Sequence, residues 1–289
     1  MEFRDLKRQY QLHKEQIDAA IQEVVDCTHF IMGQQVVSLE KELAQYTDTK
    51  YCITCANGTD ALQLALMAWE IGKKDAVFVP DFTFFSSGEV VPLTGATPVF
   101  VDVDKDTYNI SADSLRSAIE YVIQNTDLRP RVVVAVDLFG RPADYQAIRQ
   151  ITDQYGLLLL EDGAQGFGGM ADGRKACSFG DISTTSFFPS KPLGCYGDGG
   201  AVFTDNEEWA KRLMSLRVHG KGSDKYDNVR IGMNSRLDTI QAAVLLQKTG
   251  FLEEELEACG KIAKEYSKRL KDIVKIPADL GSMRSAWAQ

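Results

Sequence analysis

Short apolar segments alternate with helical patterns of apolar and polar residues along most of the chain. The apolar segments near Tyr51, Ala76, Pro98, Arg131 and Leu157 predict strands, and the segments between them predict helices. Several of these strands are continuous apolar runs, which is typical of parallel strands with helices on both faces. The alternation therefore predicts an α/β fold with a mostly parallel sheet.

Polar connectors and two further elements complete this pattern. The connectors 72–75 and 127–130 contain glycine or proline and mark turns. Residues 201–204 are expected to form another strand. The acidic stretch 253–255 is expected to lie on the solvated face of a long polar helix that runs toward Lys271.

Composition limits the function classes. The 289 residues are 44% hydrophobic and 25% charged, which is enough for a large core, and the length favours two domains. The net charge of −9 and the lack of a basic cluster with aromatic residues argue against nucleic-acid binding. The polar N-terminus, without a signal-peptide pattern or an apolar run of membrane-spanning length, predicts a cytoplasmic protein with no membrane contact.

The six cysteines are scattered, which favours free thiols. Cys52 and Cys55 form a two-cysteine pair, but no second pair or histidine cluster accompanies them. We therefore expect no metal site.

One lysine lies in an apolar, glycine-containing stretch at 186–200. Lys191 has two phenylalanines and a proline before it, and a proline and a leucine after it. Desolvation of an ammonium is costly, so a half-buried lysine lowers its pKa or becomes neutral in a Schiff base, and both states suit carbonyl chemistry. The apolar neighbours argue against the alternative of a solvated loop lysine. We expect Lys191 to be a nucleophile.

An acidic residue follows the run of leucines at 157–160. Asp162 stands at the C-terminal end of this predicted buried strand, and ligands bind at that edge of open α/β sheets. A carboxylate there can hold a protonated pyridine nitrogen, which makes the ring of pyridoxal phosphate an electron sink. The alternative is a helix N-cap or turn aspartate.

A glycine-threonine pair opens a helical pattern after the first predicted strand. Gly58 lets the backbone approach an anion, the first-turn amides favour it, and the hydroxyls of Thr59 and Ser186 add donors. The pair is thus a candidate phosphate site, and a capped turn without a ligand is the alternative.

An aromatic cluster at 80–85 follows the second predicted strand. Phe84 is expected to stack on a planar cofactor. Phe82 and Phe85 are expected to pack in the core.

These motifs together resemble the pyridoxal-phosphate sugar aminotransferases of the DegT/StrS type, a branch of the aspartate aminotransferase-like, type I fold. The resemblance covers essentially the whole chain and is carried by motifs at 57–62, 80–85, 161–165, 186–200 and 232–238. It implies a three-layer sandwich. A large cofactor-binding domain would span 1–245, with an N-terminal helical arm over 1–30, and a small C-terminal domain would begin at 246–289.

The resemblance also implies roles for single residues. Lys191 would form the Schiff base with pyridoxal 5′-phosphate, and Asp162 would pair with the pyridine nitrogen. The other implied cofactor contacts are the ring of Phe84, Gln165 beside the phenolic oxygen, and the phosphate ligands Gly58, Thr59, Ser186 and, from the neighbouring subunit, Asn234. A homodimer with shared active sites is therefore part of the expectation.

Within the family, the motifs are most similar to those of transaminases acting at C3 of a UDP-linked 3-keto sugar acid, in the synthesis of bacterial surface polysaccharide such as lipopolysaccharide. Gln165 fits this reaction, since many C4-acting relatives carry histidine there. Arg236 either pairs with the sugar carboxylate or faces solvent, and His219 either contacts substrate or is a solvated loop residue. Glutamate is the expected amino donor.

Two other functions stay open. One is a related transamination at C4, on a deoxyhexose or on a keto-inositol, and the other is a catalytically silent, pyridoxal-phosphate-bound module for regulation or assembly. Relatives of this type continue beyond a position equivalent to Gln289, so we expect the small domain to be truncated here and turnover to suffer.

Overall fold

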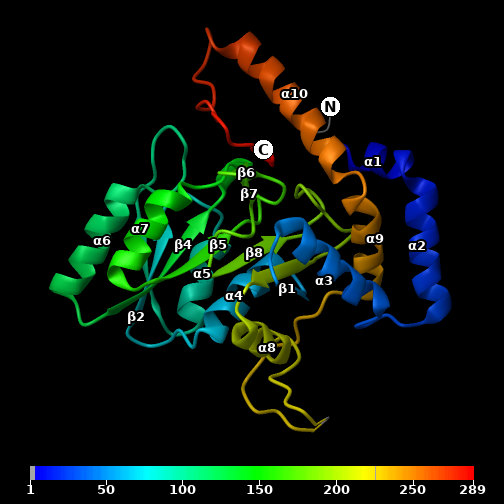
Figure 1. The fold of residues 1–289 in the computed structure, drawn as a ribbon, viewed down its shortest axis with the longest axis horizontal. Coiled ribbons are helices and arrows are strands. Elements are labelled where there is room, and N and C mark those ends of the chain that lie inside the picture. Colours follow the sequence, from blue (N-terminus) through cyan, green and yellow to red (C-terminus); the bar gives the residue numbers. More distant parts are fainter. Residues whose placement is uncertain (1–3, 225) are drawn as a thin grey trace.

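A seven-stranded sheet forms the centre of the molecule. The computed structural model describes residues 4–224 and 226–289, and Figure 1 shows the sheet with helices packed against it. The order along the sheet is β1 (Tyr51–Cys55), β9 (Gly200–Thr204), β8 (Ile182–Ser186), β5 (Leu158–Asp162), β4 (Arg129–Val136), β2 (Asp75–Pro80) and β3 (Thr97–Val101).

Strand direction in this sheet confirms the predicted mostly parallel arrangement. Within the described ranges, β9 alone runs against its neighbours, β1 and β8, and the other neighbouring strands are paired in parallel. The expected strand at 201–204 is therefore present, and it inserts between β1 and β8. The carboxyl ends of the parallel strands meet at one edge.

Two layers of helices cover the sheet, and the side chains of β4 show how. Val132 and Val134 pack into one apolar cluster, and Val133 and Ala135 pack into another on the opposite face. Successive residues of a strand point to opposite faces, so continuous apolar runs arise where both faces are buried. The first face is covered by α4 (Gly58–Ala68), α5 (Ser86–Leu93) and α8 (Glu207–Leu216), and the second by α3 (Gln34–Thr47), α6 (Ala112–Asn125), α7 (Tyr145–Tyr155) and α9 (Thr239–Thr249).

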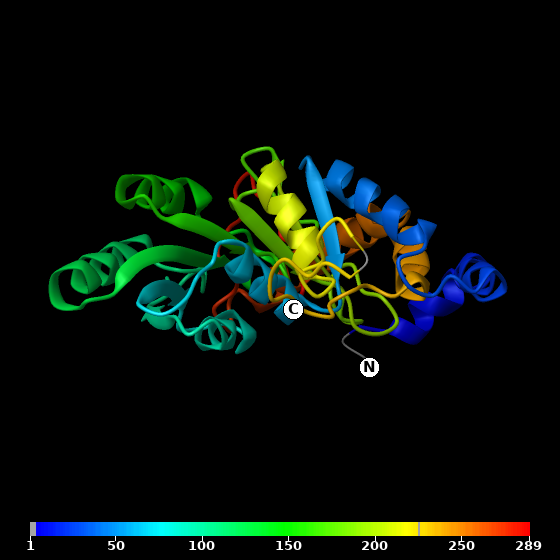
Figure 2. The ribbon, with the colours of Figure 1, turned by 90° about the horizontal axis from the view of Figure 1, so that it is seen from below.

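The N-terminal helices lie at one end of the sheet. α1 (Leu6–Leu12) and α2 (Lys14–Cys27) occupy the range expected for the arm, and α2 packs beside α9, as both views show (Figures 1 and 2). After β5 the chain forms a short hairpin of β6 (Met170–Ala171) and β7 (Arg174–Lys175). A 3₁₀ turn, η1 (Leu138–Gly140), follows β4.

The expected long polar helix is α10 (Leu252–Leu270), which projects away from the sheet in Figure 1. Its buried residues, Leu252 and Leu256, lie in the first turns. The chain after α10 returns to η1, where Ala286 N donates to Gly140 O at 2.8 Å. A cavity of about 900 Å³ lies between α10 and the loop that carries Lys191.

Candidate active site

The carboxyl ends of two neighbouring strands, β5 and β8, bring the predicted catalytic groups together. Asp162 is the last residue of β5, Ser186 is the last residue of β8, and the two strands pair in parallel. Lys191 follows β8 by five residues. Gly58 and Ser186, 128 positions apart in sequence, thus lie side by side at one edge of the sheet, the edge at which open α/β proteins bind ligands.

Asp162 is a buried carboxylate, only 5% exposed. Its Oδ2 accepts a hydrogen bond from Ser87 Oγ at 2.8 Å, and its Oδ1 accepts one from Ala164 N at 3.2 Å. Burial raises the pKa of this carboxyl, whereas the two hydrogen bonds and the charge of Lys191 lower it. A nearby cation strongly stabilises a buried carboxylate, and a protonated ring nitrogen is such a cation.

Lys191 lies in a turn closed by its own backbone, where its N–H donates to Phe188 O at 2.8 Å. Burial lowers the pKa of its ammonium, the charge of Asp162 opposes this shift, and the guanidinium of Arg4 adds to it. A lower pKa increases the fraction of neutral amine, the form that attacks a carbonyl carbon. Lys191 and Asp162 thus influence each other's pKa from the carboxyl ends of neighbouring strands.

The start of α4 fits a phosphate. The first intrahelical bond is donated by Ala61 N to Asn57 O, so the amides of Gly58 and Thr59 precede it and point out of the helix end. A Cβ atom at position 58 would lie 2.7 Å from Ser186 Cβ, so only glycine permits this approach of helix and strand. The hydroxyls of Thr59 and Ser86 lie 2.8 Å apart beside the same turn. Helix dipole, amides and hydroxyls together make this helix start a candidate anion site.

We expect Gly58→Ala to weaken the binding of pyridoxal phosphate by about tenfold or more, because the added methyl group displaces Ser186 from the phosphate site. Titration of the cofactor absorbance measures the affinity. Gly260→Ala is the matched control, since a Cβ atom there meets no atom within 4 Å. Equal affinities of the two variants would contradict the assignment of the phosphate site.

Gln165 and Phe84 take different positions at this edge. Gln165 Oε1 accepts a hydrogen bond from Phe139 N at 2.7 Å, which fixes the side chain in the turn after Asp162. Phe84 is 65% exposed, so its ring is accessible for stacking on a planar group.

The expectation that Phe82 and Phe85 pack in the core is wrong. They are 50% and 75% exposed, because β2 ends at Pro80 and the following turn leads the chain out of the sandwich. Phe82 packs on the surface against Tyr108 and Phe139.

The remaining candidates lie between α8 and α9, in the yellow to gold loops of Figure 1. Asn234 and His219 are exposed and Arg236 is half-buried. The described contacts of these three residues include neither Asp162 nor Lys191. Ala56 N donates to Ser235 Oγ at 3.1 Å, which joins this segment to the turn before Gly58.

Two contacts of the site were missed in the sequence. Ser87 Oγ holds Asp162, and the run of hydroxyl residues at 83, 86 and 87 could have indicated it. Arg4 Nη1 donates to Lys191 O at 3.3 Å, and the two residues are 187 positions apart in sequence. No local sequence pattern predicts such a contact.

Cys52 and Cys55 are buried in β1. Over residues 4–224 and 226–289, no group of three or more histidine, cysteine, aspartate or glutamate side chains is placed to hold a metal ion. Of the helices in the same ranges, none combines the length and the hydrophobicity needed to span a bilayer.

The open α/β sheet, the lysine with a lowered pKa, the buried aspartate and the helix-end anion site define an enzyme that works with a phosphorylated pyridine cofactor. The chain belongs to the DegT/DnrJ/EryC1/StrS aminotransferase family, whose model matches residues 11–289. The family resemblance, the fold class and a pyridoxal-phosphate-dependent aminotransferase activity are thereby confirmed.

Known relatives support this assignment. The UDP-2-acetamido-2-deoxy-3-oxo-D-glucuronate aminotransferase of Pseudomonas aeruginosa is 45% identical over 273 residues, which cover 94% of this chain and 74% of that protein. The crystal structure of a DegT DnrJ EryC1 StrS aminotransferase from Brucella abortus superposes with a TM-score of 0.99 at 51% identity, over 100% of this chain and 78% of that chain. The structure of ntda from Bacillus subtilis, with bound cofactor pmp, has a TM-score of 0.87 at 30% identity, over 96% and 62% of the two chains.

Proposed function

We propose that this enzyme transfers the amino group of glutamate to C3 of a UDP-linked 2-acetamido-3-oxo-uronic acid, a step in the synthesis of surface polysaccharide. The observation that carries the proposal is the placement of the half-buried Lys191 and the buried Asp162 at the same edge of the sheet, in a chain 45% identical to an aminotransferase named for that sugar. We further propose that it acts in the cytoplasm. The division into 1–245 and 246–289 is also part of the proposal.

Pyridoxal phosphate, when bound, supplies a carbonyl carbon and an electron-withdrawing ring. In our proposal the amides of Gly58 and Thr59 and the hydroxyl of Ser186 hold its phosphate, and Phe84 covers one face of the ring. Asp162 keeps the ring nitrogen protonated, and Gln165 donates to the phenolic oxygen.

Lys191 would have two tasks. Its Nζ would hold the cofactor through the carbonyl carbon that the bound cofactor supplies, with water as the leaving group, until the amine of glutamate takes its place. The freed Nζ then takes the proton from the α-carbon of the donor, and in the second half-reaction it returns a proton to C3 of the sugar. A lowered pKa suits both tasks, because the amine must be neutral to attack and to accept.

We propose a homodimer with shared active sites. The exposed position of Asn234 suits a contact with the cofactor phosphate of a neighbouring subunit. Arg236, two residues further on, would then be positioned to hold the sugar carboxylate in a bidentate contact, and His219 would lie near the same substrate.

Stepwise absorbance measurements test the reaction. Glutamate is expected to change the cofactor absorbance, and the UDP-linked 3-keto-uronic acid is expected to restore it. A dTDP-linked 4-keto-deoxyhexose and a keto-inositol are the comparison acceptors. Restoration by one of these alone would replace the proposed substrate, and no response to glutamate would favour a silent regulatory or assembly module.

We expect Arg236→Leu to raise KM for the sugar acid by about tenfold or more and to leave the half-reaction with glutamate unchanged, because a bidentate contact to the sugar carboxylate is lost. Steady-state kinetics with the sugar acid and single-turnover kinetics with glutamate separate the two effects. Arg230→Leu is the control, since Arg230 is exposed and bonds to Ser215. Equal KM values for both variants would remove Arg236 from the substrate site.

A further inference from the structure

Two more carboxyl groups, Asp137 and Glu161, are buried behind Asp162, each 0% exposed. Glu161 precedes Asp162 in β5, so the two side chains point to opposite faces of the sheet. Asp162 turns toward α5, where Ser87 binds it, and Asp137 bonds to Tyr145 of α7 on the other side. The pair of Asp137 and Glu161 is therefore separate from the ligand face.

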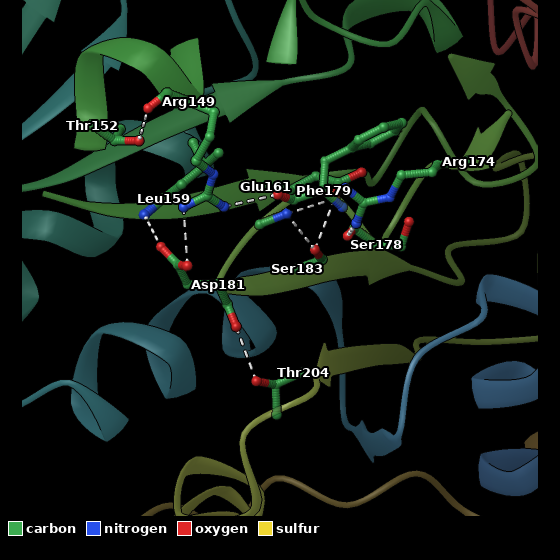
Figure 3. Close-up of polar contacts among 11 residues, drawn as sticks. Arg149, Thr152, Leu159, Glu161, Arg174, Ser178, Phe179, Asp181, Ser183 and Thr204 are labelled. Carbon is green, nitrogen blue, oxygen red and sulfur yellow. Dashed lines mark hydrogen bonds and ion pairs between the residues drawn. The ribbon is translucent and has the colours of Figure 1, made fainter. Parts of the chain in front are cut away.

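Glu161 is surrounded by donors. Its Oε2 accepts from Phe179 N and Ser183 Oγ, both at 2.7 Å, and its Oε1 accepts from Cys177 N at 2.5 Å. Figure 3 shows Glu161 between Phe179 and Ser183. Backbone amides can only donate, so this environment fits an ionised carboxylate.

Asp137 has a different environment on each oxygen. Its Oδ1 accepts from Tyr145 Oη at 2.7 Å and from Ala143 N at 3.0 Å. Its Oδ2 is buried and, among the described residues, no donor reaches it. Burial raises the pKa of Asp137, and the charge of Glu161 raises it further.

Within residues 4–224 and 226–289, the other titratable groups that act most strongly on the pair carry no positive charge. They are Tyr145 of α7 and Cys177 after β7, and burial raises the pKa of both, so they are neutral near pH 7. An ionised Asp137 would place a second negative charge beside Glu161 without a compensating cation, which is highly unfavourable in a buried site. A proton on Oδ2 removes the charge and gives this oxygen a hydrogen to donate.

We propose that Asp137 is a positioning residue that carries a proton on Oδ2 and donates it in a hydrogen bond to Glu161, so that the pair bears a single negative charge. The pair holds the turn that follows Asp162. Asp137 N donates to Asp162 O at 3.1 Å, and a Cβ atom at position 166 would lie 2.3 Å from Asp137 Oδ2. Phe139, two residues after Asp137, donates to Gln165. This role rests on the proposed function of Asp162 and Gln165.

Infrared spectroscopy of the holoenzyme tests the proton directly. At about pH 8 ordinary carboxyl groups are ionised, so a carboxylic acid C=O band reports a buried acid. We expect this band in the wild type and in Asp144→Asn, which removes an exposed helix N-cap carboxylate, and we expect its loss in Asp137→Asn. A wild type without the band, or a band unchanged in Asp137→Asn, would overturn the proposal. Turnover is not needed, so the proposed function can fail independently.

Kinetics of the glutamate half-reaction test the positioning role. Asp137→Ala removes the acceptor of Tyr145 and Ala143 and is expected to slow the glutamate half-reaction by about tenfold or more, and Asp137→Asn is expected to restore it to within about threefold of the wild type. The asparagine supplies the same acceptor and an N–H donor to Glu161. An equal loss in both variants would contradict a neutral Asp137.

The sign of the pH effect follows from the raised pKa. Above the ordinary pKa of aspartate the unfolded chain has released the proton that the folded chain keeps, so rising pH destabilises the wild type until the folded pKa is reached. Asp137→Asn has no proton to release at this position, so this loss of stability with rising pH is absent in the variant. Its Tm relative to the wild type should therefore rise between about pH 5 and about pH 8, and a constant difference would count against the buried acid.

Discussion

Lys191→Ala is expected to lower the rate of amino transfer by about a thousandfold or more, because the variant loses the amine that is proposed both to attack the carbonyl carbon and to carry the proton. The single-turnover rate with glutamate measures the loss. Borohydride reduction of the wild type, followed by peptide mapping by mass spectrometry, is expected to place a pyridoxyl group on Lys191. The variant should lack this label.

A second buried lysine provides a strict control. Lys248 is 2% exposed and lines the same cavity as Lys191, with its Nζ 4.8 Å from the ring centroid of Tyr196. Burial lowers its pKa to about 8, so desolvation alone would make it reactive as well. In Lys248→Met the label should stay on Lys191. A wild type labelled on Lys248, or on neither lysine, would refute the assignment of the nucleophile.

The two lysines show what the sequence could and could not predict. The apolar residues around Lys191 are local, and its neighbourhood with Asp162 follows from a rule, since the carboxyl ends of parallel strands meet at one edge. Lys248 lies in a regular helix pattern, where nothing local distinguishes a buried lysine from a solvated one. It lines a cavity together with residues of α1 and α10, which come from distant parts of the chain.

Long-range polar contacts likewise limit how much of the candidate site the sequence can predict. The bond from Ser87 to Asp162 spans 75 positions, and Asp137 follows β4 at a point where Val136 is in register with Asp162 of β5. The sheet order that creates both contacts is a property of the whole fold. Hydrophobic periodicity predicts that the strands exist, but it does not state which ends become neighbours.

The wrong prediction for Phe82 and Phe85 has a related cause. Aromatic composition favours burial on average, but these rings follow Pro80, where β2 has already ended. Their position therefore depends on the turn, and the turn places them on the outside. Apolar side chains exposed beside a ligand edge are compatible with the stacking role proposed for Phe84.

Asp162→Asn is expected to retain part of the cofactor binding and to lose about a hundredfold or more of the rate, because a neutral amide cannot keep the ring nitrogen protonated. The amide oxygen can still accept one of the two hydrogen bonds that Asp162 accepts from Ser87 and Ala164, so the fold should persist. Circular dichroism, cofactor absorbance and single-turnover rates separate folding, binding and chemistry.

Ser87→Ala separates the charge of Asp162 from its orientation. This change removes a neutral donor and leaves the carboxylate ionisable, so we expect a rate loss of only a few-fold, roughly the effect of one hydrogen bond between partners that stay buried. If charge at Asp162 is what sustains the reaction, Asp162→Asn must be far slower than Ser87→Ala. If the two variants were equally slow, orientation alone would explain the role of Asp162. An Asp162→Asn enzyme as fast as the wild type would exclude a role for the charge of Asp162 in the chemistry.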